Sequence, residues 1–356
     1  MAVLNFFDTY ILMAIMEEVV PETFFFRDRY FPTGEGDVFA ADKVLTEYRK
    51  GDRKMAAFVS ERIGDIPMDR IGYEIHEFQP AFVGVSRLLT VDELKKRGFG
   101  EALYANSTPA QRAARLQRDD LKDMDLRIRR REEWMAANTM LENACFIQEY
   151  VDAKTKGKAL SVKFYDGTSD HIYTPAKPWE NFAEMRADVI AMCRQLSYRG
   201  LPVVDLLLGT DTAEGVLQFP DLRELLDKNS GIVTGSINEQ LSGYTGVVLM
   251  GRINFGGFWL NLISVDETYM DDDNKTKPYF PVDAAMVTAP NCGHIMYGQI
   301  TQIDFGSTEY TSHPGIRVPK FTLNQDEDTR KLRLASRPLA APKNYCPYIL
   351  AREVVK

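Results

Sequence analysis

The chain has 356 residues, of which 45% are hydrophobic and 26% charged, a composition typical of a globular protein and not of a disordered or fibrous one. A chain of this length usually forms about two domains and buries enough surface to fold without disulfides or structural metals. Lys and Arg number 43 and Asp and Glu number 51, so the formal net charge is −8. This balance argues against a dedicated nucleic-acid binder, which usually has a basic surface.

The four cysteines lie far apart, at Cys145, Cys193, Cys292 and Cys346, with no CxxC pair and no adjacent histidine. Zinc sites need closely spaced ligands, so this pattern does not indicate one. We expect free thiols, as is usual in a reducing cytoplasm.

The N-terminal residues 3–20 are mostly apolar but contain Asp8, Glu17 and Glu18. No basic region precedes them and no small-residue cleavage site follows, which argues against a signal peptide. The charges also interrupt any apolar run of about 18 residues, so we expect an amphipathic helix that packs on protein and no contact with a membrane.

An aromatic segment follows at residues 21–32. Five aromatic residues fall within eight positions, namely Phe24, Phe25, Phe26, Tyr30 and Phe31. Aromatic side chains dominate both protein cores and protein interfaces. The sequence leaves two alternatives open: these side chains fill the core of their own subunit, or an N-terminal arm lays them on a neighbouring chain.

Residues 55–94 have the pattern of a β-ribbon. Short β-type runs occur at 56–59, 73–78 and 81–85, and the second alternates apolar and polar residues. A long ribbon with few apolar residues is poorly stable by itself. We therefore expect it to lie against something else, and another subunit is one candidate.

The strongest local signal predicts a long helix over residues 110–141. Thr108 and Gln111 form a capping box, Pro109 suits the first helical position, and no glycine or proline follows as far as Leu141. At 100° per residue, one narrow apolar stripe contains Ala113, Ala114, Leu121, Met124, Ile128 and Met135. The predicted rod buries only this stripe and runs across a surface.

Charges of both signs crowd the predicted helix: Arg127, Arg129, Arg130 and Arg131 precede Glu132 and Glu133. We favour a solvated face tied by i,i+4 pairs, namely Asp123 with Arg127, Asp125 with Arg129, and Arg129 with Glu133. A basic strip for nucleic acid and pairing with a neighbouring subunit are the alternatives.

The second half of the chain alternates helix and strand, which predicts a compact α/β subdomain. A helix is predicted from Phe182 until Gly200 ends it, and a second helix over 222–226. Strands are predicted at 203–208, 247–253, 258–265 and 294–303, with an extended segment at 338–355.

Motifs for catalysis or cofactor binding are weak. Residues 209–215 (GTDTAEG) lack the Lys-Ser/Thr pair of a phosphate loop and are better explained as a turn. Asp271–Asn274 resembles a calcium loop only in composition, because no glycine follows at the sixth position, and we expect a charged surface loop. The histidines are scattered and there is no Gly-x-Ser-x-Gly sequence. We assign no catalytic, cofactor-binding or metal-binding residue, no cofactor and no enzymatic activity.

Several stretches, taken in order, resemble the major capsid protein E family of tailed phages, the lambda-like group. These stretches are residues 21–32, Ala57-Phe58-Val59-Ser60, Glu77-Phe78-Gln79-Pro80, Leu94-Lys95-Lys96-Arg97, Arg130-Arg131-Glu132-Glu133-Trp134-Met135 and the closing strand Pro347 to Val355. The resemblance covers nearly the whole chain, with a middle part, from about Ala153 to Asn291, that matches by pattern more than by residue.

The resemblance implies an α+β protein with the HK97-like major capsid fold. Its expected parts are an N-terminal arm and first peripheral segment (1–50), an extended β-hairpin loop (51–105), a peripheral domain with a long spine helix (106–180), an axial domain (181–315) and a C-terminal peripheral segment (316–356). The expected subunit-interface residues are Phe24, Phe25, Phe26, Arg27, Tyr30, Phe31, Tyr73, Phe78, Phe82, Arg129, Arg130, Arg131, Glu132 and Glu133.

As to function, the resemblance implies a major capsid protein that self-assembles into hexamers and pentamers and forms the icosahedral shell around packaged double-stranded DNA. Expected partners are further copies of the chain and scaffolding, portal and decoration proteins. The expected location is the virion capsid, with the host cytoplasm during assembly. The alternatives are an encapsulin-type nanocompartment on the same fold and a soluble hydrolase or transferase with an unrecognised site.

Overall fold

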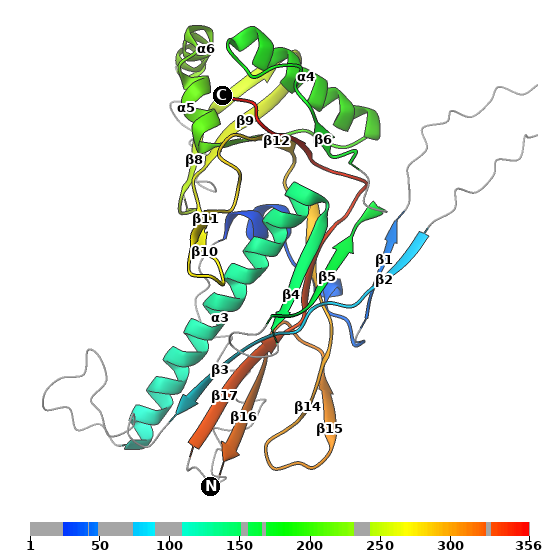
Figure 1. Ribbon diagram of the computed structural model, residues 1–356, viewed down its shortest axis with the longest axis vertical. Coiled ribbons are helices and arrows are strands. Elements are labelled where there is room, and N and C mark those ends of the chain that lie inside the picture. The colour runs from blue at the N-terminus through cyan, green and yellow to red at the C-terminus, as the bar shows by residue number, and fades with distance from the viewer. Residues whose placement is uncertain are drawn as a thin grey trace, which may run out of the picture.

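The computed structural model describes most of the chain. The described residues are 24–41, 43–48, 74–89, 109–150, 156–165, 169–230, 243–324 and 329–355. Within them the molecule is elongated, with a helix and sheet unit at one end and a larger α/β unit at the other (Figure 1). The predictions for residues 3–20, residues 56–59 and Tyr73 lie outside the described residues.

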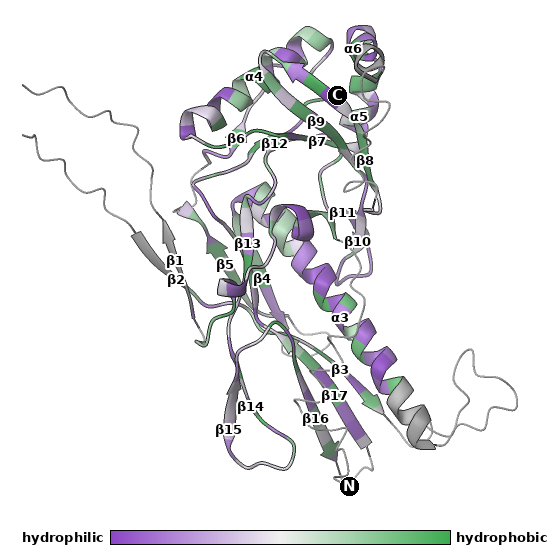
Figure 2. Cartoon of the chain, turned by 180° about the vertical axis from the view of Figure 1, so that it is seen from behind, coloured by the Kyte–Doolittle hydropathy of each residue, from purple (hydrophilic) through white to green (hydrophobic). Residues whose placement is uncertain are grey.

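The predicted long helix is confirmed as α3 (Pro109–Glu142), whose 34 residues span about 51 Å. Leu121, Met124 and Ile128 are fully buried, as the predicted apolar stripe requires. They pack on Phe321 and Leu332 from the C-terminal part of the chain. In Figure 2 hydrophobic patches alternate with hydrophilic ones along α3, since the helix has protein on one side only.

A three-stranded antiparallel sheet lies along α3. Its strands, in the order β16–β17–β3, are β16 (Val318–Asn324), β17 (Thr329–Ser336) and β3 (Val83–Leu89). The central strand therefore comes from the C-terminal part of the chain and one edge strand from the N-terminal part. Pairing over such a sequence separation cannot be read from local pattern.

The larger unit is built on a six-stranded mixed sheet with the order β6–β19–β12–β7–β9–β8. Its strands are β6 (Ile172–Tyr173), β7 (Asp205–Gly209), β8 (Val247–Phe255), β9 (Phe258–Val265), β12 (Ala285–Thr288) and β19 (Ile349–Ala351). Every residue of β7 is buried, because this strand lies inside the sheet with both faces covered.

Three helices cover this sheet (Figure 1): α4 (Phe182–Arg199), α5 (Thr210–Leu217) and α6 (Pro220–Ser230). The prediction of α4 is confirmed at both ends. The Asn181 side chain accepts a hydrogen bond from the Glu184 N–H at 3.0 Å, and Gly200 ends the helix in the left-handed conformation at φ 81°. The helix predicted at 222–226 lies within α6.

The single strand predicted over 294–303 is wrong. The structure has two strands, β13 (Gly293–Tyr297) and β14 (Ile300–Ile303), which belong to different sheets. β13 pairs with β18 (Pro338–Pro342) and β14 with β15 (Tyr310–His313). The chain changes partners at Gly298 and Gln299, whose N–H groups bond to the carbonyls of Arg337 and Ala41.

The glycine-rich residues 209–215 do not form a simple turn, because α5 begins directly at Thr210. A Cβ on Gly209 would lie 2.1 Å from the carbonyl oxygen of Pro281 and 2.4 Å from that of Val282. Thr212 donates its N–H to the same Val282 carbonyl. The glycine is therefore explained by close backbone packing and not by a phosphate.

The acidic residues 271–274 form a surface turn, as predicted. They connect the short strands β10 (Thr268–Met270) and β11 (Thr276–Pro278). The four cysteines are buried free thiols, also as predicted. No helix of the described residues is long and apolar enough to cross a membrane.

Two further pairs of strands complete the description. β1 (Val44–Tyr48) pairs with β2 (Glu74–Phe78), and β4 (Ala144–Tyr150) pairs with β5 (Lys156–Lys163). The first pair stands at the side of the molecule (Figure 1). Within the predicted ribbon the structure describes two strands. β2 belongs to this pair, and the segment after it forms β3, an edge strand of the three-stranded sheet.

We expect Gly209→Ala to lower the free energy of unfolding by about 1 to 3 kcal/mol, because the two carbonyls that meet the new methyl group belong to the backbone and cannot rotate away. Urea unfolding measures the change. Gly36→Ala is the control, since a Cβ there meets nothing within 4 Å. Equal stability of the two variants would contradict the close approach at Gly209.

Candidate functional site at the crossing of the N-terminal segment and the long helix

The aromatic segment lies in the core of its own subunit. Its five aromatic side chains are each at most 5% exposed. Phe25 makes edge-to-face contacts with Phe26, Tyr30 and Tyr244 at ring-centroid distances of 5.2 to 5.5 Å. This burial favours the first of the two alternatives, that Phe24, Phe25, Phe26, Tyr30 and Phe31 fill the core of their own subunit, and their expected part in a subunit interface stays an untested prediction.

The segment crosses α3 in a single π-helical turn, η1 (Phe26–Tyr30). The Glu133 carboxylate of α3 accepts the backbone N–H groups of Phe26 and Arg27, each at 2.7 Å. These are free donors at the start of the turn, where a negative charge is most stabilising. Glu133 is fully buried and acts as a cap from another part of the chain.

Glu132, the preceding residue, is the centre of a buried charge network. The Arg317 guanidinium donates to both Glu132 oxygens at 2.7 and 3.0 Å and to Asp125 at 2.7 Å. The Arg27 Nε and the Tyr297 hydroxyl also donate to Glu132, at 3.1 and 3.0 Å. Glu132 and Glu133 are thus buried within the subunit, and their expected part in a subunit interface stays an untested prediction.

The charges of this network stabilise one another. Burial lowers the pKa of Arg317, but the nearby Glu132 and Asp125 more than offset that effect, so the Arg317 pKa lies above its usual value. The pKa of Arg27 is raised for the same reason, with Glu132 opposing the penalty of burial. Both arginines therefore remain charged, and each pairs with a carboxylate that would otherwise be an unpaired charge in the interior.

A second network ties the segment to the six-stranded sheet. Asp205, at the start of β7, accepts two hydrogen bonds from Arg29 at 2.8 and 2.9 Å, one from the Tyr30 hydroxyl at 2.9 Å and one from the Asn261 amide at 2.8 Å. Asp205 is fully buried. The N-terminal turn is thus fixed to α3 on one side and to the larger unit on the other.

Sequence reasoning missed Arg29, Asp205 and Arg317. A weak signal existed for Asp205, because a carboxylate directly before three buried leucines needs a buried cation. For Arg317 we find no signal in the sequence, since its partners lie about 190 positions away.

The charged residues of α3 partly follow the predicted pattern of i,i+4 pairs. The pairs Asp123–Arg127 and Asp125–Arg129 form, at 3.4 and 2.7 Å. The predicted pair of Arg129 with Glu133 is wrong, because the Glu133 carboxylate turns to the N-terminal segment. This outcome supports a structural role for much of the charged run.

The other predicted interface residues have mixed surroundings. Arg131 pairs with Asp272 at 2.6 Å and stacks on the ring of Trp134. Phe78 packs on Phe164 within the chain. Arg130 is exposed, and Phe82 is 48% exposed. A subunit contact at Arg130 and Phe82 stays a prediction.

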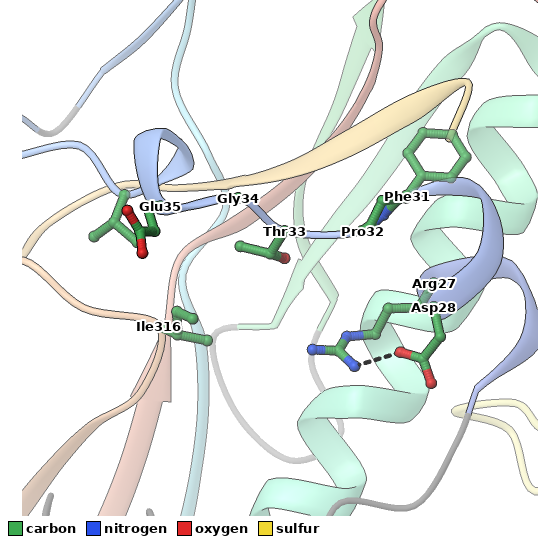
Figure 3. Close-up of a pocket in the computed structure, with 9 residues that line it drawn as sticks. Arg27, Asp28, Phe31, Pro32, Thr33, Gly34, Glu35 and Ile316 are labelled. Carbon is green, nitrogen blue, oxygen red and sulfur yellow. Dashed lines mark hydrogen bonds and ion pairs between the residues drawn. The ribbon is translucent and has the colours of Figure 1, made fainter. Parts of the chain in front are cut away.

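A surface pocket of about 490 Å³ opens beside the network (Figure 3). Arg27 and Asp28, which pair at 2.8 Å, lie on one side of it, and Glu35 and Ile316 lie on the other. The chain from Phe31 to Gly34 lines the space between them. No group of three or more potential metal ligands is found in the part of the chain that the structure describes.

Two carboxyl groups near the crossing have raised pKa values. Burial raises the pKa of Glu133 to about 8, against the opposing effect of its two backbone donors. Burial also raises the pKa of Glu267, just before β10, to about 7. A raised carboxyl pKa means that the folded chain binds the proton more tightly than the unfolded chain does.

We therefore expect the free energy of unfolding to fall as the pH rises from about 5 to about 8, between the unfolded and the folded pKa values of these groups. The stabilisation is complete below the unfolded pKa near 4.5 and is lost as the pH passes the folded values, with a slope of up to about 1.4 kcal/mol per pH unit for each proton. Glu267→Gln should make the slope shallower in urea titrations at each pH. Glu184→Gln, at a surface carboxyl of α4 with a lowered pKa, is the control and should leave the slope unchanged.

Arg317→Ala should lower the free energy of unfolding by about 3 to 5 kcal/mol, because it leaves Asp125 and Glu132 without their shared buried cation. Arg127→Ala removes only the exposed pair with Asp123 and should change the stability by less than about 1 kcal/mol. Urea unfolding at pH 7 compares the two. Similar losses in both variants would show that the buried network does not hold the crossing together.

Comparison with known proteins agrees with this architecture. The model of the family described as phage major capsid protein E matches residues 8–349. A prophage capsid protein of E. coli CFT073 has a similar structure with a TM-score of 0.68 at 16% identity, over 97% of this chain and 98% of that one. The capsid of Ralstonia phage GP4 matches with a TM-score of 0.52 at 12% identity, over 95% and 93%. No curated protein matches the sequence.

The family match extends over nearly the whole chain and includes the aromatic segment, α3 and both sheets. It favours a phage capsid over the encapsulin alternative, and a structural protein over an enzyme. The chain belongs to the phage major capsid protein E family, has the HK97-like fold and is a structural subunit of a phage capsid, located in the virion.

Proposed function

We propose that this protein assembles into hexamers and pentamers that close an icosahedral shell around packaged double-stranded DNA. Assembly takes place in the host cytoplasm, with scaffolding, portal and decoration proteins as partners. The observation that carries the proposal is the family match over residues 8–349. The likeness to capsid structures over at least 93% of each chain is in accord with it.

The shape of the subunit supports this assembly. A closed shell needs heterologous contacts, in which one surface of a subunit meets a different surface of the next. The elongated body offers distinct surfaces at its two ends and along its sides (Figure 1). The buried network at Glu132 and the contacts of Asp205 hold the two ends of the subunit in one arrangement. A subunit contact made at one end therefore also sets the position of the other end.

The domain assignment is part of the proposal. The axial domain is formed by the six-stranded sheet with α4, α5 and α6, and the peripheral domain by α3 with β3, β16 and β17. We place β14 and β15 with the peripheral domain, although they lie within the range 181–315 expected for the axial domain. The support is the packing of Ile300 against Val318 and Ala335 of the peripheral sheet.

The net negative charge of the chain is compatible with DNA enclosed in the shell. A formal net charge of −8 gives DNA phosphates little net attraction, so DNA can enter the shell without adhering to it. A reconstruction of the shell with a strongly basic inner wall would contradict this part of the proposal.

Negative-stain electron microscopy after size-exclusion chromatography of the full-length protein tests the assembly directly. We expect capsomers or closed shells of uniform size. A small discrete oligomer that never forms shells, with or without the other virion proteins, would contradict the proposal. Genes for a portal, a protease and a terminase beside the coding sequence would separate a phage capsid from a cargo compartment.

Arg130→Glu should leave the subunit folded and reduce the yield of shells at least severalfold, because this exposed arginine on α3 is available to an acidic neighbour. Electron microscopy counts the shells, and urea unfolding verifies the fold. Lys122→Glu reverses another exposed charge on the same helix and is the matched control. Normal shell yield from Arg130→Glu would show that this arginine is only a solvated side chain.

A further inference from the structure

The three helices of the axial domain lie toward opposite edges of its six-stranded sheet. Tyr173 of β6, the strand at one edge, donates to Asp188 in the middle of α4 at 2.7 Å. At the end of α4, Arg199 donates to the Asp170 carbonyl, just before β6, at 2.6 Å. α6 packs on β8, the strand at the other edge. Both views accordingly show α4 on one side of this domain and α5 and α6 on the other (Figure 1, Figure 2).

The exposed surface of α4 is basic and aromatic. Among its charged residues Arg186 and Arg194 are exposed, whereas Glu184 and Asp188 are partly buried and bonded within the chain. Neither of these two arginines forms an ion pair within the part of the chain that the structure describes. Tyr198 lies one turn after Arg194 on the same side of the helix and is 75% exposed. Arginine and tyrosine are enriched in protein interfaces, so this surface is suited to a protein partner.

The exposed surface of α5 and α6 is acidic. Its exposed carboxylates are Asp211, Glu214, Asp221 and Glu224. Among the side chains described for these two helices, Arg223 is the one exposed cation. Asp211 and Asp221 lie in the first turns, where a carboxylate also complements the helix dipole. Glu214 and Glu224 lie one turn later, where the dipole gives no reason for an acidic residue.

The charges decide which surfaces can meet. The two surfaces lie at opposite edges of one sheet, so a basic surface can reach an acidic one only on another copy of the chain. A symmetric contact would place Arg194 against Arg194, or the carboxylates of α5 and α6 against each other, and like charges across an interface are unfavourable. Opposite charges meet only in a heterologous contact, in which α4 of one copy faces α5 and α6 of the next.

We propose that the exposed surface of α4 binds the surface of α5 and α6 on the neighbouring copy. Arg194 lies among the four carboxylates, and the Tyr198 ring covers Leu225, which is 36% exposed. Repeated around a ring, this one contact closes a capsomer. The inference rests on the proposed function and deepens it, because it names the surfaces that meet within one capsomer.

Cysteine cross-linking of the full-length protein under assembly conditions tests the contact. Tyr198→Cys is combined in turn with Glu214→Cys and Glu224→Cys, and mild oxidation is followed by non-reducing electrophoresis. The four native cysteines are buried and do not compete. A disulfide forms only when the two Cα atoms come within about 7 Å. The control combines Tyr198→Cys with Lys275→Cys, at an exposed position of the turn between β10 and β11.

A heterologous contact has a distinct cross-linking pattern. Because every copy carries both cysteines, the disulfides join copies in a row and give a ladder of dimers, trimers and larger species up to the capsomer. We expect at least one pair to give at least fivefold more trimer and larger species than the control. A ladder no stronger than the control overturns the proposal.

Two other patterns would identify a different occupant of the α4 surface. Dimers alone, formed equally by Tyr198→Cys without a second variant, overturn the proposal in favour of a symmetric contact. Cross-links from Tyr198→Cys to a different virion protein, in place of the ladder, overturn it in favour of an accessory partner.

Charge reversal tests the electrostatic part of the contact. Arg194→Glu should reduce the capsomer fraction in sedimentation velocity at least severalfold. Adding Glu214→Arg and Glu224→Arg to the same chain should restore it, because every copy then carries the exchanged charges on both surfaces. Lys275→Glu is the control, and urea unfolding verifies each fold. An unchanged capsomer fraction in Arg194→Glu, or no recovery in the combined variant, contradicts the charge pairing.

The contact and the shell function can fail separately. Electron microscopy scores closed shells independently of the cross-links. A ladder without shells supports the contact and contradicts the shell function. Shells without a ladder contradict the contact and leave the shell function intact.

Discussion

The whole subunit depends on the removal of two adjacent carboxylates, Glu132 and Glu133, from water. A buried carboxylate is tolerated only when hydrogen bonds and opposite charge replace its hydration. Glu133 obtains two hydrogen bonds from the backbone of the N-terminal turn but no opposite charge, in keeping with its raised pKa, whereas Glu132 obtains both from Arg27, Arg317 and Tyr297. These donors come from three distant parts of the chain, so satisfying two neighbouring residues on one helix determines where all three must lie.

The N-terminal turn connects the two units of the molecule because of this requirement. On the α3 side it holds Glu133, and on the other side Arg29 and Tyr30 hold Asp205 at the start of β7. A single turn of five residues thus contacts the helix of one unit and the central sheet of the other. The aromatic side chains around it exclude water, which strengthens every charged hydrogen bond in the crossing. Rotation of one unit against the other would break both sets of contacts.

Features with a local periodic signal could be predicted from the sequence, and those created by distant contacts could not. The capping box and apolar stripe predicted α3, and the pair of Asn181 and Gly200 marks the ends of α4. The HK97-like fold followed from the order of the family resemblances. The sequence could not decide whether the aromatic segment packs in its own subunit or on a neighbouring chain, because both kinds of burial require the same residues. The charged run on α3 gave no hint that Glu132 and Glu133 face inward, since the Arg317 that pairs with Glu132 and the Arg27 that contacts both are far away in sequence.

The distribution of charge along the chain matters more than its total. Residues 1–23 contain four carboxylates and no cation, so half of the formal net charge of −8 lies in a segment of 23 residues. The opposed cations Lys320 and Arg333 show the converse, a local excess of positive charge on an acidic protein. Net charge determines long-range repulsion between subunits and DNA, whereas segregated charge determines which surfaces meet. A capsid subunit can therefore repel DNA as a whole and still present a cationic face on its peripheral sheet.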